Sequence, residues 1–153
     1  MKHHKPASAI AKMGFRSKLE MQVNQQLVDA GLSFSYEGPM NVIQYTNPVT
    51  NHRYLADFLL CNGIIIETKG IFDAQDRKKH LYIQEQYPIL DIRFVFMNSN
   101  NRLSKSSKTT YATWAETHGF LWADKLIPES WLKEKKEPEA LQEIIALLKG
   151  RRK

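Results

Sequence analysis

Apolar residues recur every three or four positions near both ends of the chain, which is the spacing of one helix face. The stretch 17–30 carries such a stripe and is followed by Gly31, a residue that commonly ends helices. The stretch 140–148 repeats the spacing and predicts a second amphipathic helix. Two more helices are predicted between them, over about 73–87 and over 110–118.

Short runs rich in β-branched and aromatic residues predict the strands. The clearest pair is Tyr54–Leu60 and Ile64–Thr68, which the three residues Cys61-Asn62-Gly63 join into a predicted hairpin. The other predicted strands cover residues 34–36, 42–45, 92–97 and 120–123, with a turn through Asn47-Pro48. Strands that alternate with helices around a central hairpin predict an α/β fold, with a mixed sheet flanked by helices.

Basic residues gather at the two ends of the 153-residue chain, whose formal net charge is +6. The first eighteen residues contain five lysines and arginines and no acid, and the last three are Arg151-Arg152-Lys153. This polarity suits a polyanionic partner, with nucleic acid ahead of an anionic membrane. A hydrophobic content of 42% is enough for one sizeable core. We therefore expect a basic arm over 1–14, one domain over 15–133 and a charged extension over 134–153.

Cysteine usage and the amino-terminal residues bear on the cellular compartment. Cys61 is the single cysteine, so an internal disulfide is excluded, which fits a reducing environment. The first residues, MKHHKPASAIAKMG, lack the apolar centre of a signal peptide, and no apolar run approaches a membrane span. We therefore expect a soluble cytoplasmic protein without a membrane partner.

Two carboxylates occupy matching places in the predicted hairpin. Asp57 and Glu67 stand five residues on either side of Asn62, the middle residue of the loop. With a three-residue loop whose Gly63 is left-handed, the two acids lie opposite each other on one face, ~5 Å apart. A two-residue Asn62-Gly63 turn would instead place them on opposite faces of the sheet.

Two opposed carboxylates repel each other unless a positive charge lies between them. Mg²⁺ or Mn²⁺ would supply that charge, because both prefer oxygen ligands. Lys69 shares the face of Glu67, where an ammonium beside an ion can position a water or stabilise a phosphate oxygen. The structural alternative is a surface pair of acids neutralised by Lys69 alone.

The spacing of Asp57, Glu67 and Lys69 resembles the PD-(D/E)xK nuclease core, except that Ala56 stands where the family pattern has proline. The chain further resembles the phage endonuclease I family, the Holliday-junction resolvases of T-odd podophages, over roughly residues 14–133. Six segments in the same order carry this resemblance, which makes it more specific than the metal motif alone. They are FRSKLE (15–20), ADFLL (56–60), ETKG (67–70), DRKKHL (76–81), LDIR (90–93) and ADKLIP (123–128).

Membership of that family would imply a Mg²⁺-dependent endonuclease that cuts branched DNA, four-way junctions above all, as a domain-swapped homodimer. It would imply that Asp57 and Glu67 bind one ion together with the backbone carbonyl of Thr68. Glu20 and Asp57 would serve a second ion, with Glu20 contributed by the partner subunit. Lys69 would complete the catalytic set, and Mn²⁺ would be expected to substitute for Mg²⁺.

Several of these residues also have simpler interpretations. Glu20 stands three positions after Ser17, the spacing of a capping box, so capping and metal binding are both open to it. His80 has three open roles: a general base, a DNA contact or a helix-packing residue. The candidate DNA contacts, which solvation of a charged surface would explain equally, are Arg16, Lys18, Arg77, Lys78, Lys79, Arg102, Lys105 and Lys108.

Two other functions are open at this point. One is a nuclease of the same core that cuts linear duplex DNA, of the nicking, repair or restriction type. The other is a non-catalytic DNA-binding module in which the charged hairpin is only structural. Comparing cleavage of a four-way junction with that of its component duplexes separates the first, and metal-dependent cleavage separates the second.

Overall fold

The computed structural model describes residues 14–47 and 50–150, so most of the predicted basic arm, Pro48 of the predicted turn and the last three residues lie outside it. The helices of the described residues are α2 (Lys18–Asp29), the 3₁₀ turn η1 (Pro39–Asn41), α3 (Ala74–Gln86), α4 (Tyr111–Thr117), α5 (Glu129–Lys133) and α6 (Pro138–Lys149). The strands are β1 (Phe34–Tyr36), β2 (Val42–Asn47), β3 (Thr50–Leu55), β4 (Phe58–Leu60), β5 (Ile64–Lys69), β6 (Asp91–Phe96) and β7 (Trp122–Asp124). Within these ranges, no helix combines the length and apolar character that a membrane crossing needs.

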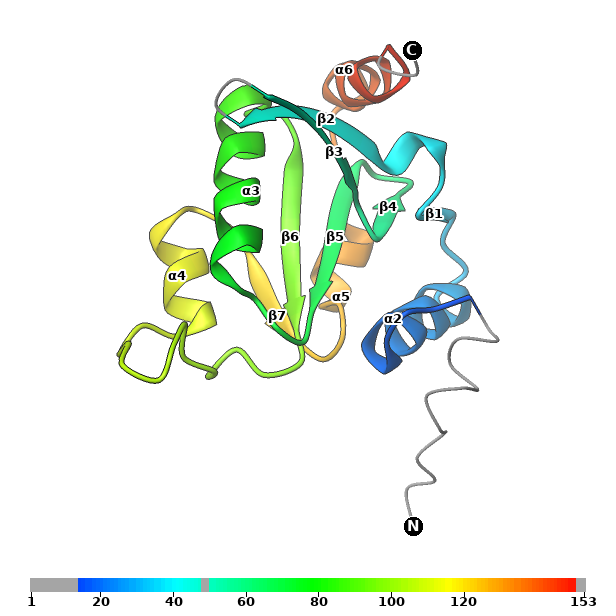
Figure 1. Cartoon of the computed structure of the whole chain (residues 1–153). Helices are drawn as coiled ribbons and strands as arrows, with labels where there is room; N and C mark the ends of the chain where they lie inside the picture. The colour runs from blue at the N-terminus through cyan, green and yellow to red at the C-terminus, as the bar shows by residue number, and fades with distance from the viewer. Residues whose placement is uncertain (1–13, 48–49, 151–153) are drawn as a thin grey trace.

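A five-stranded mixed sheet lies at the centre, in the order β1-β4-β5-β6-β7 (Figure 1). β4 pairs antiparallel with β1 and β5, whereas β5, β6 and β7 run parallel. A second, two-stranded sheet is the antiparallel pair β2-β3. The predicted α/β fold with a mixed sheet is confirmed, and η1 and α5 are additions too short to show a helical period.

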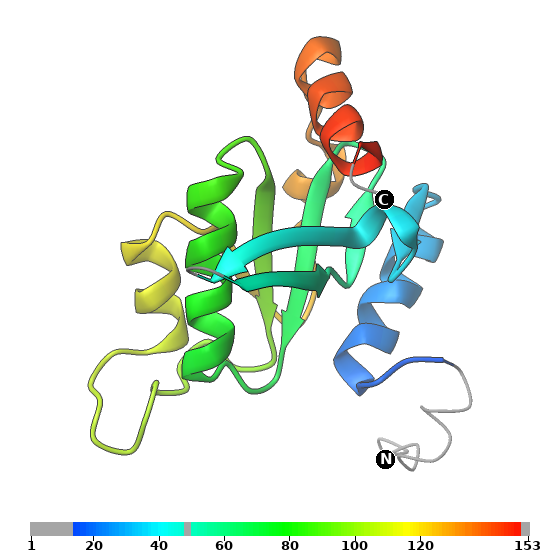
Figure 2. The same cartoon turned by 45° about the horizontal axis from the view of Figure 1, so that its top comes forward.

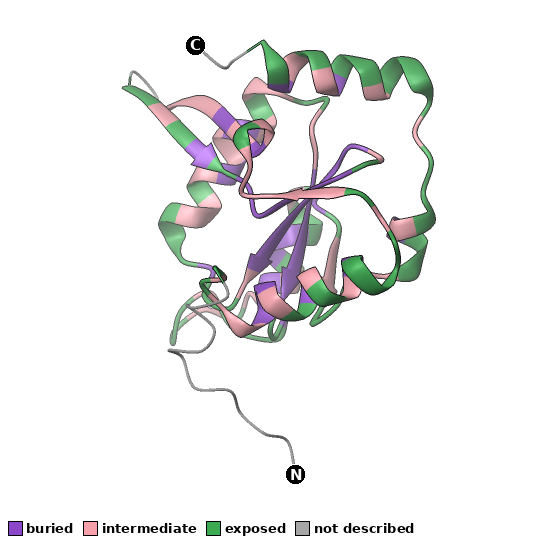
Figure 3. Ribbon diagram, turned by 90° about the vertical axis from the view of Figure 1, so that its right-hand side faces the viewer, coloured by how far each residue is buried: buried purple, intermediate pink, exposed green. Residues whose placement is uncertain are grey.

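The side chains of β5 alternate between two apolar clusters, one on each face of the central sheet. Ile64 and Ile66 pack with the stripe of α2 and with Trp131 of α5. Ile65 lies in the other cluster, with Ile83 of α3 and residues of α4 and α6. Buried residues concentrate in the central strands, while the helices that cover them expose their outer sides (Figure 3).

The hairpin of β4 and β5 has the register that places its two acids on one side. Phe58 pairs with Ile66 and Leu59 pairs with Ile65, which leaves the three-residue loop 61–63. Gly63 has a φ of +82, and a Cβ at this position would also meet Leu141 of α6 at 2.9 Å. The left-handed turn is the reason for glycine here, since the end of the Leu141 side chain could move aside. The three-residue loop predicted from the spacing is confirmed.

The continuous strand predicted over residues 54–60 is wrong. β3 ends at Leu55 and β4 begins at Phe58, and the backbone changes partners in between. Ala56 N–H donates to the carbonyl of Asn41, whereas the carbonyl of Asp57 accepts from Glu37 N–H. The chain thus leaves the small sheet and enters the central one at Asp57, which places this acid at a join between two sheets.

The β2-β3 pair crosses the α3 face of the central sheet (Figure 2). Its far end is held to α3 by Gln86, whose side chain accepts from Thr46 N–H and donates to the Thr46 carbonyl, both at 2.8 Å. Its near end delivers Tyr54, which is buried in the cluster on that face. The crossing therefore brings a tyrosine hydroxyl over the end of β5.

The carboxyl-terminal segment is anchored to the core by apolar and ionic contacts. Ile144 and Leu148 of α6 are buried in the cluster on the α3 face. Arg93 of β6 is 3% exposed and donates to both carboxylate oxygens of Glu134, at 2.8 Å each. Asp91 also pairs with Arg93, at 2.7 Å. Packing is thus one role of the predicted amphipathic helix.

Candidate active site

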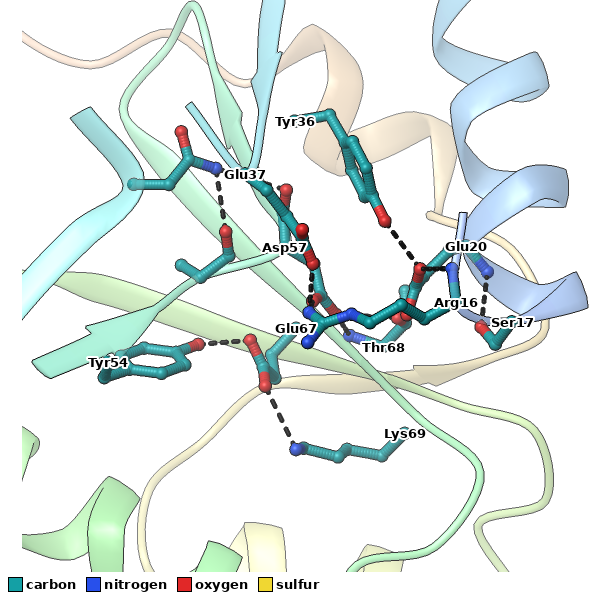
Figure 4. A network of polar contacts seen from close by, with 12 residues as sticks. Arg16, Ser17, Glu20, Tyr36, Glu37, Tyr54, Asp57, Glu67, Thr68 and Lys69 are labelled. Atoms are coloured by element: carbon teal, nitrogen blue, oxygen red, sulfur yellow. Dashed lines mark hydrogen bonds and ion pairs between the residues drawn. The ribbon is translucent and has the colours of Figure 1, made fainter. Parts of the chain in front are cut away.

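A pocket of about 370 Å³ opens where β3 and β5 end, beside the start of α2 (Figure 4). Glu67 is the second residue after Ile65 and therefore lies on the α3 face of β5. The other acids reach the pocket from α2, from the join after β3 and from the start of α3. The pocket is lined by Arg16, Glu20, Arg53, Tyr54, Leu55, Asp57, Glu67, Thr68, Lys69, Asp76 and Lys79.

Asp57 is 4% exposed and is held by the strand beside it. Its Oδ2 accepts from the backbone N–H of Thr68 at 2.8 Å and from the Thr68 hydroxyl at 2.7 Å. Its Oδ1 lies 3.6 Å from the guanidinium of Arg16. Burial and the nearby charge of Glu67 raise the pKa of Asp57 to about 7, against the lowering effect of the Thr68 bonds. Ionising Asp57 is therefore costly here, because the carboxylate is buried and lies near the charge of Glu67.

Glu67, also 4% exposed, belongs to a closed chain of contacts. The Tyr54 hydroxyl donates to its Oε2, and Lys69 Nζ lies 3.0 Å from its Oε1. Lys69 is also 3.1 Å from Asp76, which is 3.2 Å from Lys79. The Lys79 ammonium lies 4.7 Å from the centre of the Tyr54 ring and completes the circuit. These contacts fix the orientation of the Glu67 carboxylate.

Lys69 is a charged ammonium in this arrangement. Burial alone would lower its pKa, but the carboxylates of Glu67 and Asp76 outweigh that effect and raise the pKa above its usual value. A lysine with a raised pKa does not take up protons near neutral pH. Its contribution to chemistry in this pocket is therefore positive charge and hydrogen-bond donation.

Glu20 both caps α2 and lines the pocket. Its N–H donates to the hydroxyl of Ser17 at 3.1 Å, the N-cap bond of the helix. Its carboxylate accepts from Arg16 N–H at 2.9 Å and from the Tyr36 hydroxyl at 2.7 Å. The bond to Arg16 stands in place of the reciprocal bond to Ser17 N–H in a full capping box. The N-cap at Ser17 is confirmed, whereas the Glu20 carboxylate bonds Arg16 N–H and Tyr36 instead of completing the capping box (Figure 4).

Arg16 is the exposed cation above these acids. Its guanidinium pairs with Glu37 and lies 3.6 Å from Asp57. Glu37 adopts a left-handed backbone with a φ of 44, an uncommon conformation for a residue with a Cβ. Strained backbone of this kind clusters at functional sites. The ion pair with Glu37 holds the Arg16 guanidinium across the mouth of the pocket.

Comparison with known proteins identifies the family of this chain. Its sequence matches the family described as phage endonuclease I over residues 1–152. The chain belongs to the phage endonuclease I family. Endonuclease I of Escherichia phage T7 is 51% identical over 132 residues, which is 86% of this chain and 87% of that protein. Endodeoxyribonuclease 1 of Enterobacteria phage T3 is 54% identical over 123 residues, 80% of each chain. The resemblance drawn from the six sequence blocks is confirmed, and the family match extends beyond them at both ends.

Most of the predicted DNA contacts lie on the surface of this protein. Arg16, Lys78, Arg102, Lys105 and Lys108 are exposed, the last three on the loop before α4. Other candidates have partners within the protein. Arg77 donates to the carbonyl of Phe72 at 2.6 Å, Lys79 pairs with Asp76, and Lys18 lines a groove beside α2 together with Lys125.

The prediction of His80 as a DNA contact is wrong for this structure, because the ring is completely buried. His80 lies behind Glu67, with Nε2 at 3.9 Å from Oε1. It is enclosed by Tyr54, Phe94 and Phe120. A side chain in this position cannot reach a phosphate in solvent.

Among the residues in or beside the pocket that escaped the sequence analysis are Tyr54, Glu37 and Asp76. Tyr54 looks like an ordinary strand aromatic, and only the crossing of the two sheets brings its hydroxyl to Glu67. Glu37 carries no sequence signal, because its contact with Arg16 joins residues far apart in the chain. Asp76 had one available signal: it begins the block DRKKHL, just after the hairpin.

The acids of this pocket suit a divalent cation. Asp57 and Glu67 offer carboxylate oxygens, the ligands that Mg²⁺ and Mn²⁺ prefer. Burial first, and then the charge of Glu67, raise the pKa of Asp57, and a cation beside the carboxylate would offset both effects. Within residues 14–47 and 50–150, however, no three acids, histidines or cysteines converge tightly enough to form a complete ion site. The carboxylate of Glu20 is engaged by Tyr36 and would have to turn to join the other two.

Proposed function

We propose that this member of the phage endonuclease I family hydrolyses phosphodiester bonds in branched DNA, with four-way junctions as its main substrate. The observation that carries the proposal is the buried Asp57–Glu67 pair, with the Lys69 ammonium 3.0 Å from Glu67. Two buried carboxylates next to a fixed cation form a site for a metal ion and a phosphate together. The family and both relatives support nuclease activity.

Asp57 and Glu67, together with the Thr68 carbonyl, would hold one Mg²⁺ ion, and Glu20 with Asp57 would serve a second. Bound there, the ions would lower the pKa of a water to make the attacking hydroxide and would stabilise the departing 3′ oxygen. Mn²⁺ would replace Mg²⁺, because it accepts the same oxygen ligands. Hydrolysis of this kind leaves 5′-phosphate and 3′-hydroxyl ends.

The protein itself contributes orientation and charge. Tyr54 fixes one oxygen of Glu67, and the two bonds from Thr68 fix Asp57. Lys69 would stabilise negative charge on a phosphate oxygen. Arg16, which is exposed at the mouth, would contact the DNA backbone. Each group is held by its neighbours before substrate arrives, which is the arrangement that electrostatic catalysis requires.

Selection of junctions would depend on shape, because a resolvase must act on many sequences. Backbone contacts from exposed cations such as Lys78, Arg102, Lys105 and Lys108 fix position without reading bases. Two such surfaces at a fixed angle would fit duplex arms that leave a branch point. A linear duplex has a single direction and would contact only one of the two surfaces.

We further propose that the enzyme is a homodimer in which α2 is exchanged between subunits. Glu20 of α2 lines the pocket of its own chain in this single-chain structure. Exchange of α2 would place the same side chain in the equivalent pocket of the partner. Two pockets in one particle would also allow the paired cuts that resolve a junction.

Cleavage of a labelled four-way junction and of its component duplexes, each with Mg²⁺ and with EDTA, tests the function. We expect the junction to be cut much faster and only with metal. Asp57→Asn and Glu67→Gln should abolish cleavage while junction binding in a gel-shift assay is kept. Equal rates on junction and duplex would indicate a duplex nuclease, and binding without any cleavage by the wild type would indicate a non-catalytic module.

A further inference from the structure

His80 is a buried polar residue with an unmet hydrogen-bonding need. The ring is 0% exposed, in the middle of α3. Within the described residues neither Nδ1 nor Nε2 has a hydrogen-bond partner. Aromatic rings enclose it: Tyr54 at 5.1 Å and Phe94 at 4.8 Å between ring centres, both edge-on. Buried polar groups in proteins are nearly always paired, so an unpaired imidazole among aromatic rings requires an explanation.

The ring is directed at the pocket. Its Nε2 lies 3.9 Å from Oε1 of Glu67, which is the oxygen that also faces Lys69 at 3.0 Å. The distance is too long for a hydrogen bond, but a shift of about 1 Å would bring it into range. Burial and the charges of Lys79 and Lys69 hold the pKa of His80 well below its usual value, so the ring is neutral. A neutral imidazole with its hydrogen on Nε2 is a donor toward a carboxylate.

We propose that His80 is a positioning residue for Glu67, which donates Nε2–H to Oε1 whenever Lys69 leaves that oxygen. The inference rests on the proposed function, in which Lys69 serves the phosphate. Lys69 is already shared between Glu67, at 3.0 Å, and Asp76, at 3.1 Å, so turning it toward a phosphate oxygen draws it away from these carboxylates. When Lys69 turns away, Oε1 loses its donor, and the buried ring behind it supplies the replacement. Glu67 then keeps its orientation between Tyr54 on Oε2 and His80 on Oε1.

A packing role and a positioning role predict opposite effects of replacing His80 by phenylalanine. If His80 only filled the aromatic enclosure, phenylalanine would serve better, because it removes two unpaired polar atoms from the core. A positioning role needs the nitrogen at the Nε2 place. Glutamine approximates that place with its own Nε2 amide, whereas phenylalanine has nothing there to donate.

The test is Mn²⁺ binding to the full chain in a Lys69→Ala background, where Oε1 of Glu67 has lost its ammonium donor. Binding is measured by calorimetry without DNA for the Lys69→Ala parent and for the same chain with His80→Phe or His80→Gln. Groups that orient a metal ligand typically change affinity 10–100-fold when removed. We expect His80→Phe to bind Mn²⁺ about 10-fold more weakly than this parent, with an unchanged or higher melting temperature, and His80→Gln to recover most of the affinity. An affinity equal to the parent's in His80→Phe would overturn the proposal, as would an equal loss in both variants.

Two controls separate this inference from the proposed function. Asp57→Asn should lose Mn²⁺ binding, and if wild type and Asp57→Asn bind alike, the metal site itself is wrong. The second control needs no variant, so it holds even if His80→Phe fails to fold. Proton NMR of the wild type with Mg²⁺ and a junction whose linkages at the branch point cannot be hydrolysed should show the imidazole N–H of His80 in a hydrogen bond, shifted downfield from its position in EDTA. An unshifted signal in this complex would contradict a hydrogen bond from His80 to Glu67.

Discussion

Replacing Asp57 by asparagine should stabilise the metal-free protein while abolishing its activity. The pKa of Asp57 is raised from 3.8 to about 7, chiefly by burial and then by the charge of Glu67. Each pKa unit corresponds to about 1.36 kcal/mol, so ionising Asp57 costs the folded state at most about 4 kcal/mol. Asparagine keeps an oxygen for the Thr68 donors and removes the charge. Allowing for relaxation of an open pocket, we expect a gain of about 2 kcal/mol or more.

The gain should depend on pH in a defined direction. Because the folded pKa lies above the unfolded value, the penalty is absent below pH ~4, grows as the pH rises and is complete above pH ~7. Calorimetric melting in EDTA should therefore show Asp57→Asn melting about 4–8 °C higher than wild type at pH 8. The two proteins should melt alike near pH 4. Added Mg²⁺ should narrow the difference at pH 8, since only the wild type gains from binding it.

Glu67→Gln is the matched control from the same pocket. Glu67 is already paired with Lys69 and Tyr54, so the loss of its charge breaks an ion pair, which outweighs the relief of its repulsion with Asp57. We expect a loss of about 1–3 kcal/mol at pH 8. If Asp57→Asn is no more stable than wild type at pH 8 in EDTA, or if both substitutions stabilise, the charge balance derived for this pocket is incorrect.

Three further predictions concern Glu20, the basic surface and assembly. Glu20→Gln should keep the melting temperature of the protein, because an amide still accepts the bonds from Arg16 and Tyr36, but should reduce Mg²⁺-dependent cleavage by orders of magnitude. Ser17→Ala should instead lose ~1 kcal/mol of stability and keep activity. A wild-type cleavage rate in Glu20→Gln would mean that Glu20 only helps to cap α2. If about six phosphates are contacted, log K for junction binding should fall with log salt at a slope of roughly −5. Lys78→Ala should reduce that slope by about one for every DNA, whereas Lys79→Ala, which also breaks the Asp76 pair, should lower the melting temperature as well; an unchanged slope removes Lys78 from the contact set. Light scattering should give a mass near twice 17.8 kDa at micromolar concentration, and a stable monomer that still makes paired cuts would contradict the dimer.

The central hairpin could be predicted because its determinants are local. Gly63 allows the left-handed turn, and the equal spacing of Asp57 and Glu67 about Asn62 then follows from the register. The break at Ala56 could not be predicted, since it depends on Asn41, a residue fifteen positions earlier that bonds the carbonyls of Ala56 and Asp57. Nothing in the sequence around Tyr54–Leu60 distinguishes one strand from two strands in different sheets.

The burial of one side of α3 could not be predicted for a related reason. Its apolar residues do not gather on one stripe, and its buried side includes His80 next to Ile83. A charged helix with a histidine in its middle looks solvent-exposed when only its own residues are considered. The enclosure by Phe94, Phe120 and Tyr54 comes from elements far apart in the chain, so the burial of His80 appears only in three dimensions.

The composition of the pocket lining has a consequence for the order of events on DNA. Four acids (Glu20, Asp57, Glu67 and Asp76) stand against four bases (Arg16, Arg53, Lys69 and Lys79), so the lining is neutral when all of them are ionised. A neutral pocket neither repels a phosphate backbone nor draws it in, and a bound divalent ion would tip it to positive. The surrounding basic surface would then bind the junction, and the metal ion would be needed only to draw the phosphate into the pocket. DNA binding and cleavage would therefore be separate steps.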